Sequence, residues 1–254
     1  MPHIPMTTRA KPSRPLYLAS SSPRRRQLLT QAGIAFELFV VPVDEDALTA
    51  GYTGDLATLG QYLALAKALA AREELVKQNK WGRILSADTT VLLDGRSLPK
   101  PRDLAEAETM LRDLRGREHI VATGVALAEE NGCVVAATAT TRVLMRDYSD
   151  EEIAAYVATG DPLDKAGAYS IQHPGFHPVA AMHGCHLGVI GLPICLVSTL
   201  LNHTTLPGAA APDLRHRPGT CPWSGACTPP YPADEMGTPA DEAPEPAEPT
   251  EPVG

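Results

Sequence analysis

Hydrophobic and polar positions follow two different periods along residues 16–203, so the chain mixes strands with helices. Continuous apolar or β-branched runs predict strands at 16–19, 36–43, 83–94, 120–128 and 133–144. Leucine and alanine at helical spacing predict helices at 23–33, 55–80, 103–114, 149–158 and after 193. The two runs flanking Glu129-Glu130-Asn131-Gly132 read as a hairpin. Alternating helices and strands with an antiparallel component predict an α/β fold with a mixed sheet.

Local signals mark where two of these helices begin. Ser22 followed by Pro23 is typical of a helix N-cap and first helical residue, and Gly33 would end that helix. Ser149 with Glu152 three residues later forms a capping box. A polar loop from 160 to 175 precedes short strands that extend to about Ile190.

Composition divides the 254 residues into three parts. Residues 204–254 hold 12 of the 24 prolines and eight acidic residues against two arginines, and such segments bury too little apolar surface to fold. We therefore predict a flexible leader at 1–15, one folded domain at 16–203 and a disordered Pro/Glu-rich tail at 204–254. A role for the tail in binding a partner is the alternative to a dispensable tail.

Charge and the remaining composition exclude several classes of function. The net charge of −8 and an aromatic content of 5% argue against nucleic-acid binding. About −6 of that charge falls in the tail, so it does not exclude a small anionic ligand bound by the domain. No run approaches the ~20 apolar residues of a membrane span.

The five cysteines are scattered and form no close CxxC pair. Neither a disulfide framework nor a zinc site is therefore supported, and a reducing cytoplasm fits best. P-loop and Rossmann glycine motifs are absent from the sequence.

The opening strand–turn–helix unit is the strongest candidate for anion binding. A helix N-terminus presents unpaired N–H groups, and Arg24 and Arg25 in its first turn oppose the helix dipole unless an anion lies between them and the helix end. The arginine fork suits phosphate. The alternative is a solvated basic helix face.

Three further segments carry candidate chemistry. Asp88, within a predicted central strand, could bind a metal or activate water, or it could simply hydrogen-bond to nearby backbone. Lys100, between two prolines, is by itself most simply a surface lysine. The loop from Asp161 to Gln172 could line a pocket and contact a nucleotide base, although its composition alone marks only a loop.

Six motifs, in this order, resemble those of the Maf family of nucleoside triphosphate pyrophosphatases. They are LASSSPRR (18–25), VDE (43–45), SADT (86–89), KPRD (100–103), DKAGAYSIQ (164–172) and GLP (191–193). The resemblance covers about 16–201. It implies a two-lobed fold similar to inosine triphosphate pyrophosphatases, with a twisted mixed sheet, flanking helices and a nucleotide cleft. Members of the family are commonly dimeric, so a homodimer is expected.

The same resemblance implies an activity and a set of site residues. The reaction is hydrolysis of a nucleoside triphosphate to the monophosphate and pyrophosphate, with a divalent metal such as Mg²⁺ or Mn²⁺. Asp88 matches the family's proton acceptor, and Glu45, expected on the second strand, would hold the metal with Asp88. The other positions that match substrate-binding residues are Ser20, Arg24, Arg25, Lys67, Thr89, Lys100 and Gln172.

Arg24, Thr89 and Gln172 match the group that acts on dTTP and UTP, which makes a pyrimidine triphosphate the expected substrate. One departure bears on this preference, since His173-Pro174 stands where the family usually has glycine after the glutamine. The same chemistry on 7-methyl-GTP or another modified nucleotide is therefore an alternative. A regulator of septum formation that binds nucleotides without catalysis is a second alternative.

Overall fold

The computed structural model describes residues 14–203, so the tail and nearly all of the predicted leader lie outside it. The described residues form one seven-stranded sheet in the order β2-β1-β3-β5-β6-β7, with β4 paired to β3. The strands are β1 (Leu16–Leu18), β2 (Glu37–Leu38), β3 (Arg83–Leu93), β4 (Arg96–Leu98), β5 (Glu118–Ala128), β6 (Val134–Met145) and β7 (Val179–His183). β1 runs parallel to β2 and β3, whereas the other pairs are antiparallel. The predicted mixed sheet and the 120–144 hairpin are confirmed.

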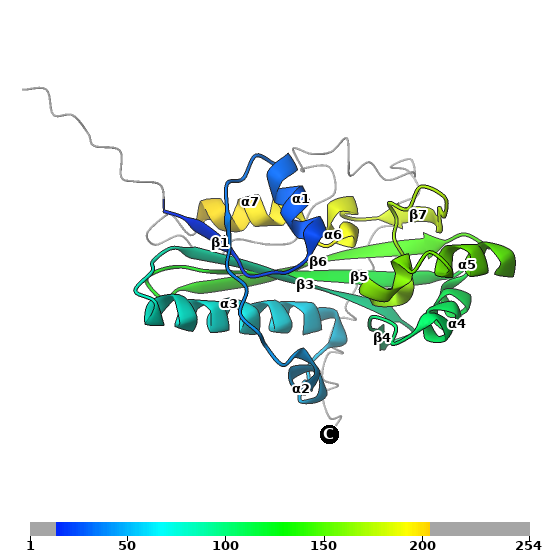
Figure 1. Ribbon diagram of the computed structural model, residues 1–254, viewed down its shortest axis with the longest axis horizontal. Helices are drawn as coiled ribbons and strands as arrows, with labels where there is room; N and C mark the ends of the chain where they lie inside the picture. The colour runs from blue at the N-terminus through cyan, green and yellow to red at the C-terminus, as the bar shows by residue number, and fades with distance from the viewer. Residues whose placement is uncertain (1–13, 204–254) are drawn as a thin grey trace, which may run out of the picture.

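Helices cover both faces of this sheet (Figure 1). They are α1 (Pro23–Gln31), α2 (Glu45–Ala50), α3 (Leu59–Lys77), α4 (Leu104–Leu114), α5 (Asp150–Val157), α6 (His186–Ile190) and α7 (Ile194–His203). In Figure 1, α3 lies along one face, α1, α6 and α7 lie along the other, and α4 and α5 sit at one end. Three short 3₁₀ turns, η1 (Leu56–Thr58), η2 (Asp161–Asp164) and η3 (Ala166–Ala168), complete the elements.

Both predicted helix starts are confirmed. Ser22 is the N-cap of α1, and Pro23 is its first residue. Ser149 and Glu152 form a reciprocal capping box at the start of α5. These caps satisfy backbone N–H groups that the helix leaves without partners, so they set each starting point locally.

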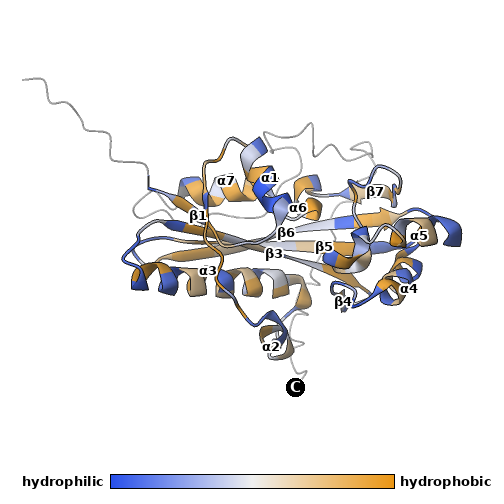
Figure 2. Cartoon of the chain, viewed as in Figure 1, coloured by the Kyte–Doolittle hydropathy of each residue, from blue (hydrophilic) through white to orange (hydrophobic). Residues whose placement is uncertain are grey.

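The pleat of β3 divides the core between the two faces of the sheet. Successive side chains on a strand point to opposite faces. Leu85 and Ala87 pack into the cluster beneath α1 and α7, whereas Ile84 packs into the cluster beneath α3. In Figure 2, hydrophobic and hydrophilic residues alternate along the helices, and the strands are most hydrophobic toward their ends and paler in the middle of the sheet.

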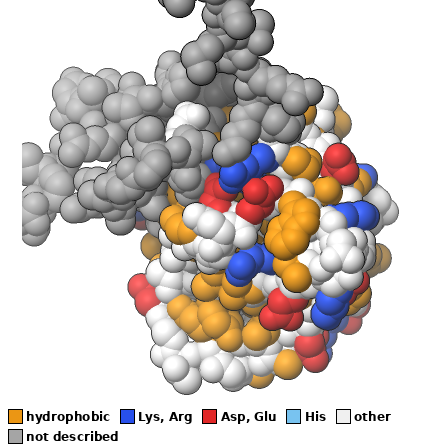
Figure 3. Space-filling view, turned by 90° about the vertical axis from the view of Figure 1, so that its left-hand side faces the viewer, with side chains coloured by type: hydrophobic (Ala, Val, Ile, Leu, Met, Phe, Trp, Pro, Cys, Tyr) orange, Lys and Arg blue, Asp and Glu red, His pale blue; other side chains and the backbone are white. Residues whose placement is uncertain are grey.

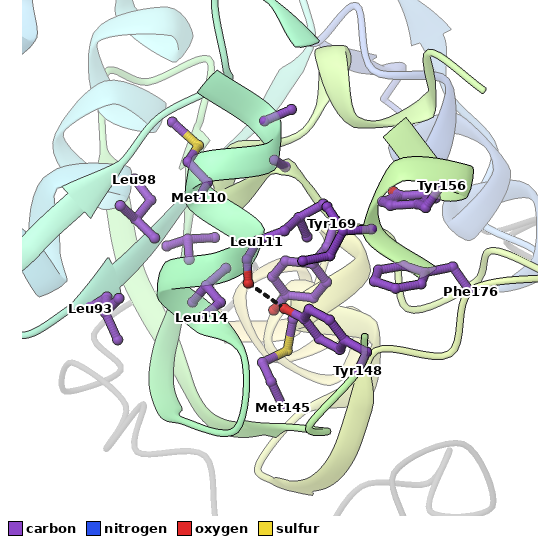
Figure 4. Packing of buried hydrophobic residues seen from close by; sticks show 14 of the residues in the cluster. Leu93, Leu98, Met110, Leu111, Leu114, Met145, Tyr148, Tyr156, Tyr169 and Phe176 are labelled. Carbon is purple, nitrogen blue, oxygen red and sulfur yellow. Dashed lines mark hydrogen bonds between the residues drawn. The ribbon is translucent and has the colours of Figure 1, made fainter. Parts of the chain in front are cut away.

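A third cluster lies at the end of the sheet covered by α4 and α5 and includes several buried aromatic rings (Figure 4). The Tyr148 hydroxyl donates to the Leu111 carbonyl at 2.7 Å. Tyr156 stacks on Phe176 with ring centroids 4.4 Å apart. This cluster supports the loop that carries the 164–172 motif.

Three predictions about elements and their boundaries are wrong. The strand predicted at 36–43 shrinks to Glu37–Leu38, because β2 is an exposed edge strand that pairs only with the three-residue β1. Glu45 therefore lies on α2 and not on the second strand, since the Asp44 side chain accepts from the Ala47 N–H and starts a helix there. In addition, the segment that ends at Ile190 is helix α6 and not a strand.

Within 14–203, no helix combines the length and the apolar character that crossing a membrane requires. Cys133 and Cys185 form no disulfide bond, whereas Cys195 on α7 is disulfide-bonded, which the scattered spacing did not predict.

Candidate active site

All nine predicted site residues line a single cleft of about 620 Å³. They come from six separate segments: the turn before α1 and its first residues, α2, α3, β3, the loop after β4, and the loop after η3. The residues are Ser20, Arg24, Arg25, Glu45, Lys67, Asp88, Thr89, Lys100 and Gln172.

Lys67 lies between the two acidic residues of the cleft. Its Nζ is 2.6 Å from Asp88 Oδ1 and 2.8 Å from Glu45 Oε2. The Lys67 and Asp88 side chains are 14% and 15% exposed, so this ion pair is shielded from water more than a surface pair would be. One cation thus holds two carboxylates from different elements at a single point.

Two glycines allow α3 to approach the sheet closely enough for this contact. A Cβ added to Gly60 on α3 would lie 2.9 Å from the Asp88 carbonyl oxygen. A Cβ added to Gly124 on β5 would lie 2.1 Å from the Gln61 backbone nitrogen. The absence of side chains at these positions therefore sets the distance between Lys67 and β3.

Arg25 is fixed from three sides at the start of α1. Its Nε donates to the Gly191 carbonyl at 2.8 Å, and its two terminal nitrogens donate to Ser20 Oγ at 3.0 Å and Thr89 Oγ1 at 3.3 Å. Burial lowers the pKa of Arg25, and the nearby charge of Asp88 opposes this effect. Because Thr89 follows Asp88 on β3, the pleat directs Asp88 toward α3 and Thr89 toward α1.

Arg24 takes part in a charged network that includes residues missing from the predicted site. Arg24 Nη1 lies 2.9 Å from Asp164 Oδ2. Lys165 Nζ donates to Asp164 Oδ1 at 2.6 Å and to Asp161 Oδ1 at 2.9 Å. Partial burial acts to raise the pKa of Asp164, but the hydrogen bonds from Lys165 and Arg24 outweigh it and lower that pKa.

Asp164 and Lys165 belong to the motif that carries the resemblance, and that motif was the signal that could have added them to the site. Both line the cleft. Asp164 links the start of α1 to the end of η2 across 140 residues of sequence.

Lys100 and Gln172 lie at exposed positions on the cleft wall. The loop that carries Lys100 is held by a hydrogen bond from the Gly167 N–H to the Pro99 carbonyl at 3.2 Å. The Gln172 N–H donates to Ser170 Oγ at 3.2 Å.

Tyr169 connects the cleft wall to the sheet through a buried histidine. His119 Nε2 lies 2.7 Å from the Tyr169 hydroxyl, and His119 Nδ1 has no hydrogen-bond partner among the described residues. Burial lowers the pKa of His119 to about 4. Burial also raises the pKa of Tyr169, so both groups are neutral near pH 7.

Glu45 and Asp88 are the acidic residues of the cleft that could hold a divalent metal. Residues 14–203 contain no group of three or more histidine, cysteine or acidic side chains that could hold a metal ion. Glu45 and Asp88 nevertheless both contact the Lys67 ammonium group, so their carboxylates lie close together. Mg²⁺ is usually held by one or two carboxylates together with substrate phosphates. The two residues therefore fit a metal that arrives with a phosphate ligand.

Positive side chains gather in the cleft although the net charge of the whole chain is −8. On the end of the molecule shown in Figure 3, lysine and arginine side chains stand beside aspartate and glutamate. In the cleft itself, Arg24, Arg25, Lys67, Lys100 and Lys165 gather around a volume suited to a small, highly charged molecule.

The chain is similar to several known proteins. Three relatives named dTTP/UTP pyrophosphatase align with this chain over more than nine tenths of their own lengths. They come from Thermomicrobium roseum (43% identity; 81% of this chain and 91% of the relative), Escherichia coli O157:H7 (41%; 74% and 92%) and Geobacter sp. strain M21 (44%; 72% and 91%). Among solved structures, a HAM1 protein from Coxiella burnetii aligns with a TM-score of 0.42 at 15% identity, over 74% of this chain and 98% of that one.

The family model described as Maf-like protein matches residues 15–204. That match spans the whole sheet, its helices and every segment of the cleft, and the chain belongs to the Maf family.

Proposed function

We propose that this protein hydrolyses nucleoside triphosphates, with dTTP and UTP preferred, to the monophosphate and pyrophosphate. The observation that carries the proposal is the meeting of five cationic side chains and the Asp88 carboxylate in one cleft. The names of relatives at 41–44% identity, matched over most of their length, support the pyrimidine preference.

The triphosphate would lie at the N-terminal end of α1. Arg25 is already oriented by Ser20, Thr89 and Gly191, so binding costs little side-chain entropy there. Arg24 is held by Asp164, and a phosphate would compete with this carboxylate for the guanidinium. Lys100, at the exposed rim, would reach the phosphates from the opposite wall.

Asp88 is suited to act as the proton acceptor. Its carboxylate faces the cleft from the central strand β3, where the backbone is fixed by pairing with β5. The Lys67 ammonium holds Oδ1, which leaves the second carboxylate oxygen to orient a water molecule and take its proton. Fixed cations around the phosphates would stabilise the charge that develops on the leaving pyrophosphate.

Glu45 and Asp88 would hold the divalent metal together with phosphate oxygens. When bound, such a metal supplies charge neutralisation and orientation of the phosphates. Lys67 contacts both carboxylates and would share them with that ion.

Gln172, Ser170 and Ile171 also line the cleft and are the proposed contacts of the base. His173 stands directly beside Gln172. Because this histidine stands where the family usually has glycine, 7-methyl-GTP or another modified nucleotide is a second candidate substrate. We place the reaction in the cytoplasm, where nucleoside triphosphates are formed, and the homodimer stays a prediction.

A substrate panel with separate measurements of pyrophosphate and orthophosphate tests the proposal. With Mg²⁺, dTTP and UTP are expected to give pyrophosphate at higher kcat/KM than dCTP, GTP or 7-methyl-GTP. Asp88→Asn keeps the shape but removes the proton acceptor, so kcat should fall by about 10²–10⁴.

Asp147→Asn is the matched control, since Asp147 is exposed and does not line the cleft. It should keep the wild-type rate. Release of orthophosphate alone, an unchanged rate in Asp88→Asn, or tight nucleotide binding without turnover would contradict the proposed reaction.

A further inference from the structure

His173 organises the backbone turn that follows Gln172. Its Nδ1 accepts hydrogen bonds from the Gly175 N–H at 3.2 Å and the Phe176 N–H at 3.0 Å. A single side-chain acceptor thus closes the turn at 173–176, in the way that an Asp or Asn side chain closes a local turn. The imidazole can do so only while Nδ1 carries no proton.

The same ring is anchored on the aromatic cluster beneath it. The His173 and Tyr156 rings meet edge to face with centroids 4.9 Å apart. Tyr156 in turn stacks on Phe176, as Figure 4 shows, and its hydroxyl donates to Asp161 Oδ2 at 2.7 Å. Tyr156 and Phe176 are each 2% exposed, so the anchor is rigid.

Gln172 is therefore constrained on both sides, although its own side chain is exposed. On one side its N–H donates to Ser170 Oγ, and on the other side the backbone enters the turn closed by His173. Because a side chain's direction follows from its backbone, fixing this turn fixes where the Gln172 amide can reach in the cleft.

We propose that His173 is a positioning residue that sets base selectivity by holding Gln172 in place. This inference rests on the proposed function, since it names how the same cleft distinguishes bases. His173 contacts neither the cations nor Asp88 among the hydrogen bonds and ring contacts of the described residues, so it acts through Gln172 and not on the phosphates. The imidazole contributes two separable features, the Nδ1 acceptor and the ring packed on Tyr156.

Three substitutions separate these features. His173→Gly removes both the acceptor and the ring. His173→Phe keeps a ring against Tyr156 but removes the acceptor. His173→Asn removes the ring but places a carbonyl oxygen close to the position of Nδ1.

Selectivity is measured as the ratio of kcat/KM for dTTP to that for dCTP and for GTP. We expect it to fall on the order of tenfold in His173→Gly and His173→Phe, because one neutral hydrogen bond to the base is worth about that factor. His173→Asn should recover most of the wild-type ratio. The loss should fall on KM for dTTP more than on kcat.

A double substitution tests whether Gln172 transmits the effect. Gln172→Ala should lose selectivity by itself, and adding His173→Gly should then cause no further loss. His177→Gly is the control, since His177 is an exposed histidine of the same segment whose residue does not line the cleft.

Wild-type selectivity in both His173→Gly and His173→Phe would overturn the inference, as would an equal loss in His173→Asn. Independent, multiplicative losses in the double variant would also overturn it. Thermal unfolding of each variant shows whether a loss comes from unfolding. Absence of pyrophosphate release from every nucleotide by the wild-type protein would instead mean that the proposed function has failed.

Discussion

Lys67 is the residue on which the arrangement of the cleft depends most directly. It is the cation that holds Asp88 and Glu45 together, and both contacts are shorter than 3 Å. Without it, two carboxylates would face each other in a partly buried site with no compensating charge, which is costly.

Lys67→Met keeps the length of the side chain but removes its charge. We expect kcat/KM for dTTP to fall by about 10² or more, because Asp88 loses its orienting contact and the phosphates lose a cation. Steady-state kinetics at saturating Mg²⁺ measure this.

Lys77→Met is the matched control for Lys67→Met, since Lys77 lies at the exposed end of the same helix with its side chain 70% exposed. Its rate should match that of the wild type. Equal rates for the two variants would mean that Lys67 has no role in the reaction.

At the scale of elements, the packing of α3 on the sheet is what brings Lys67 to Asp88. α3 begins at Leu59, and Gly60 in its first turn faces the Asp88 backbone. Gly124, opposite Asp88 in the β3–β5 register, removes the side chain that would otherwise push this helix away. The close contact between helix and strands is thus a condition for the site.

Gly124→Ala should displace α3 from the sheet. Its Cβ would lie 2.1 Å from the Gln61 backbone nitrogen, which cannot move without the helix. We expect a loss of about 1–3 kcal/mol in the free energy of unfolding, measured by urea denaturation, together with a lower kcat/KM.

Gly51→Ala provides the comparison for Gly124→Ala, because a Cβ there would meet nothing closer than 3.5 Å. Its stability should be unchanged or slightly higher. A stable, fully active Gly124→Ala protein would show that the close approach is not needed.

For the molecule as a whole, the pH dependence of stability should reflect the buried His119. Its pKa is about 4 in the folded protein because of burial, against about 6.5 in the unfolded chain. Between these values the unfolded state binds more protons, so acidification favours unfolding. The contribution is fully present above pH 6.5 and is lost as the pH falls toward 4.

Urea unfolding at pH 7.5 and pH 5 should show this effect as a loss of about 2 kcal/mol from His119 alone. In His119→Gln, which cannot titrate, the decrease between the two pH values should be smaller by about that amount. His177→Gln, at an exposed position, should keep the wild-type pH dependence. Identical pH dependence in His119→Gln and the wild type would contradict a neutral, buried His119.

Much of the fold could be predicted from sequence because its signals are local. The N-caps at Ser22 and Ser149 and the 120–144 hairpin depend on residues within a few positions of one another, and all are confirmed. The extent of β2 was wrong because the length of an edge strand depends on its partner, and β1 is only three residues long. Glu45 lies on a helix and not on that strand because the Asp44 side chain caps α2 there, which is a local signal.

The sequence by itself determined most of the helices and strands, the order of the motifs and the residue types available for chemistry, since periodicity, caps and turns act over short distances. Only the tertiary structure decided that Lys67 joins Glu45 to Asp88 and that Arg24 pairs with Asp164. These contacts depend on how closely helices approach the sheet and on which side chains the pleat directs into the cleft. Packing across the whole chain sets both.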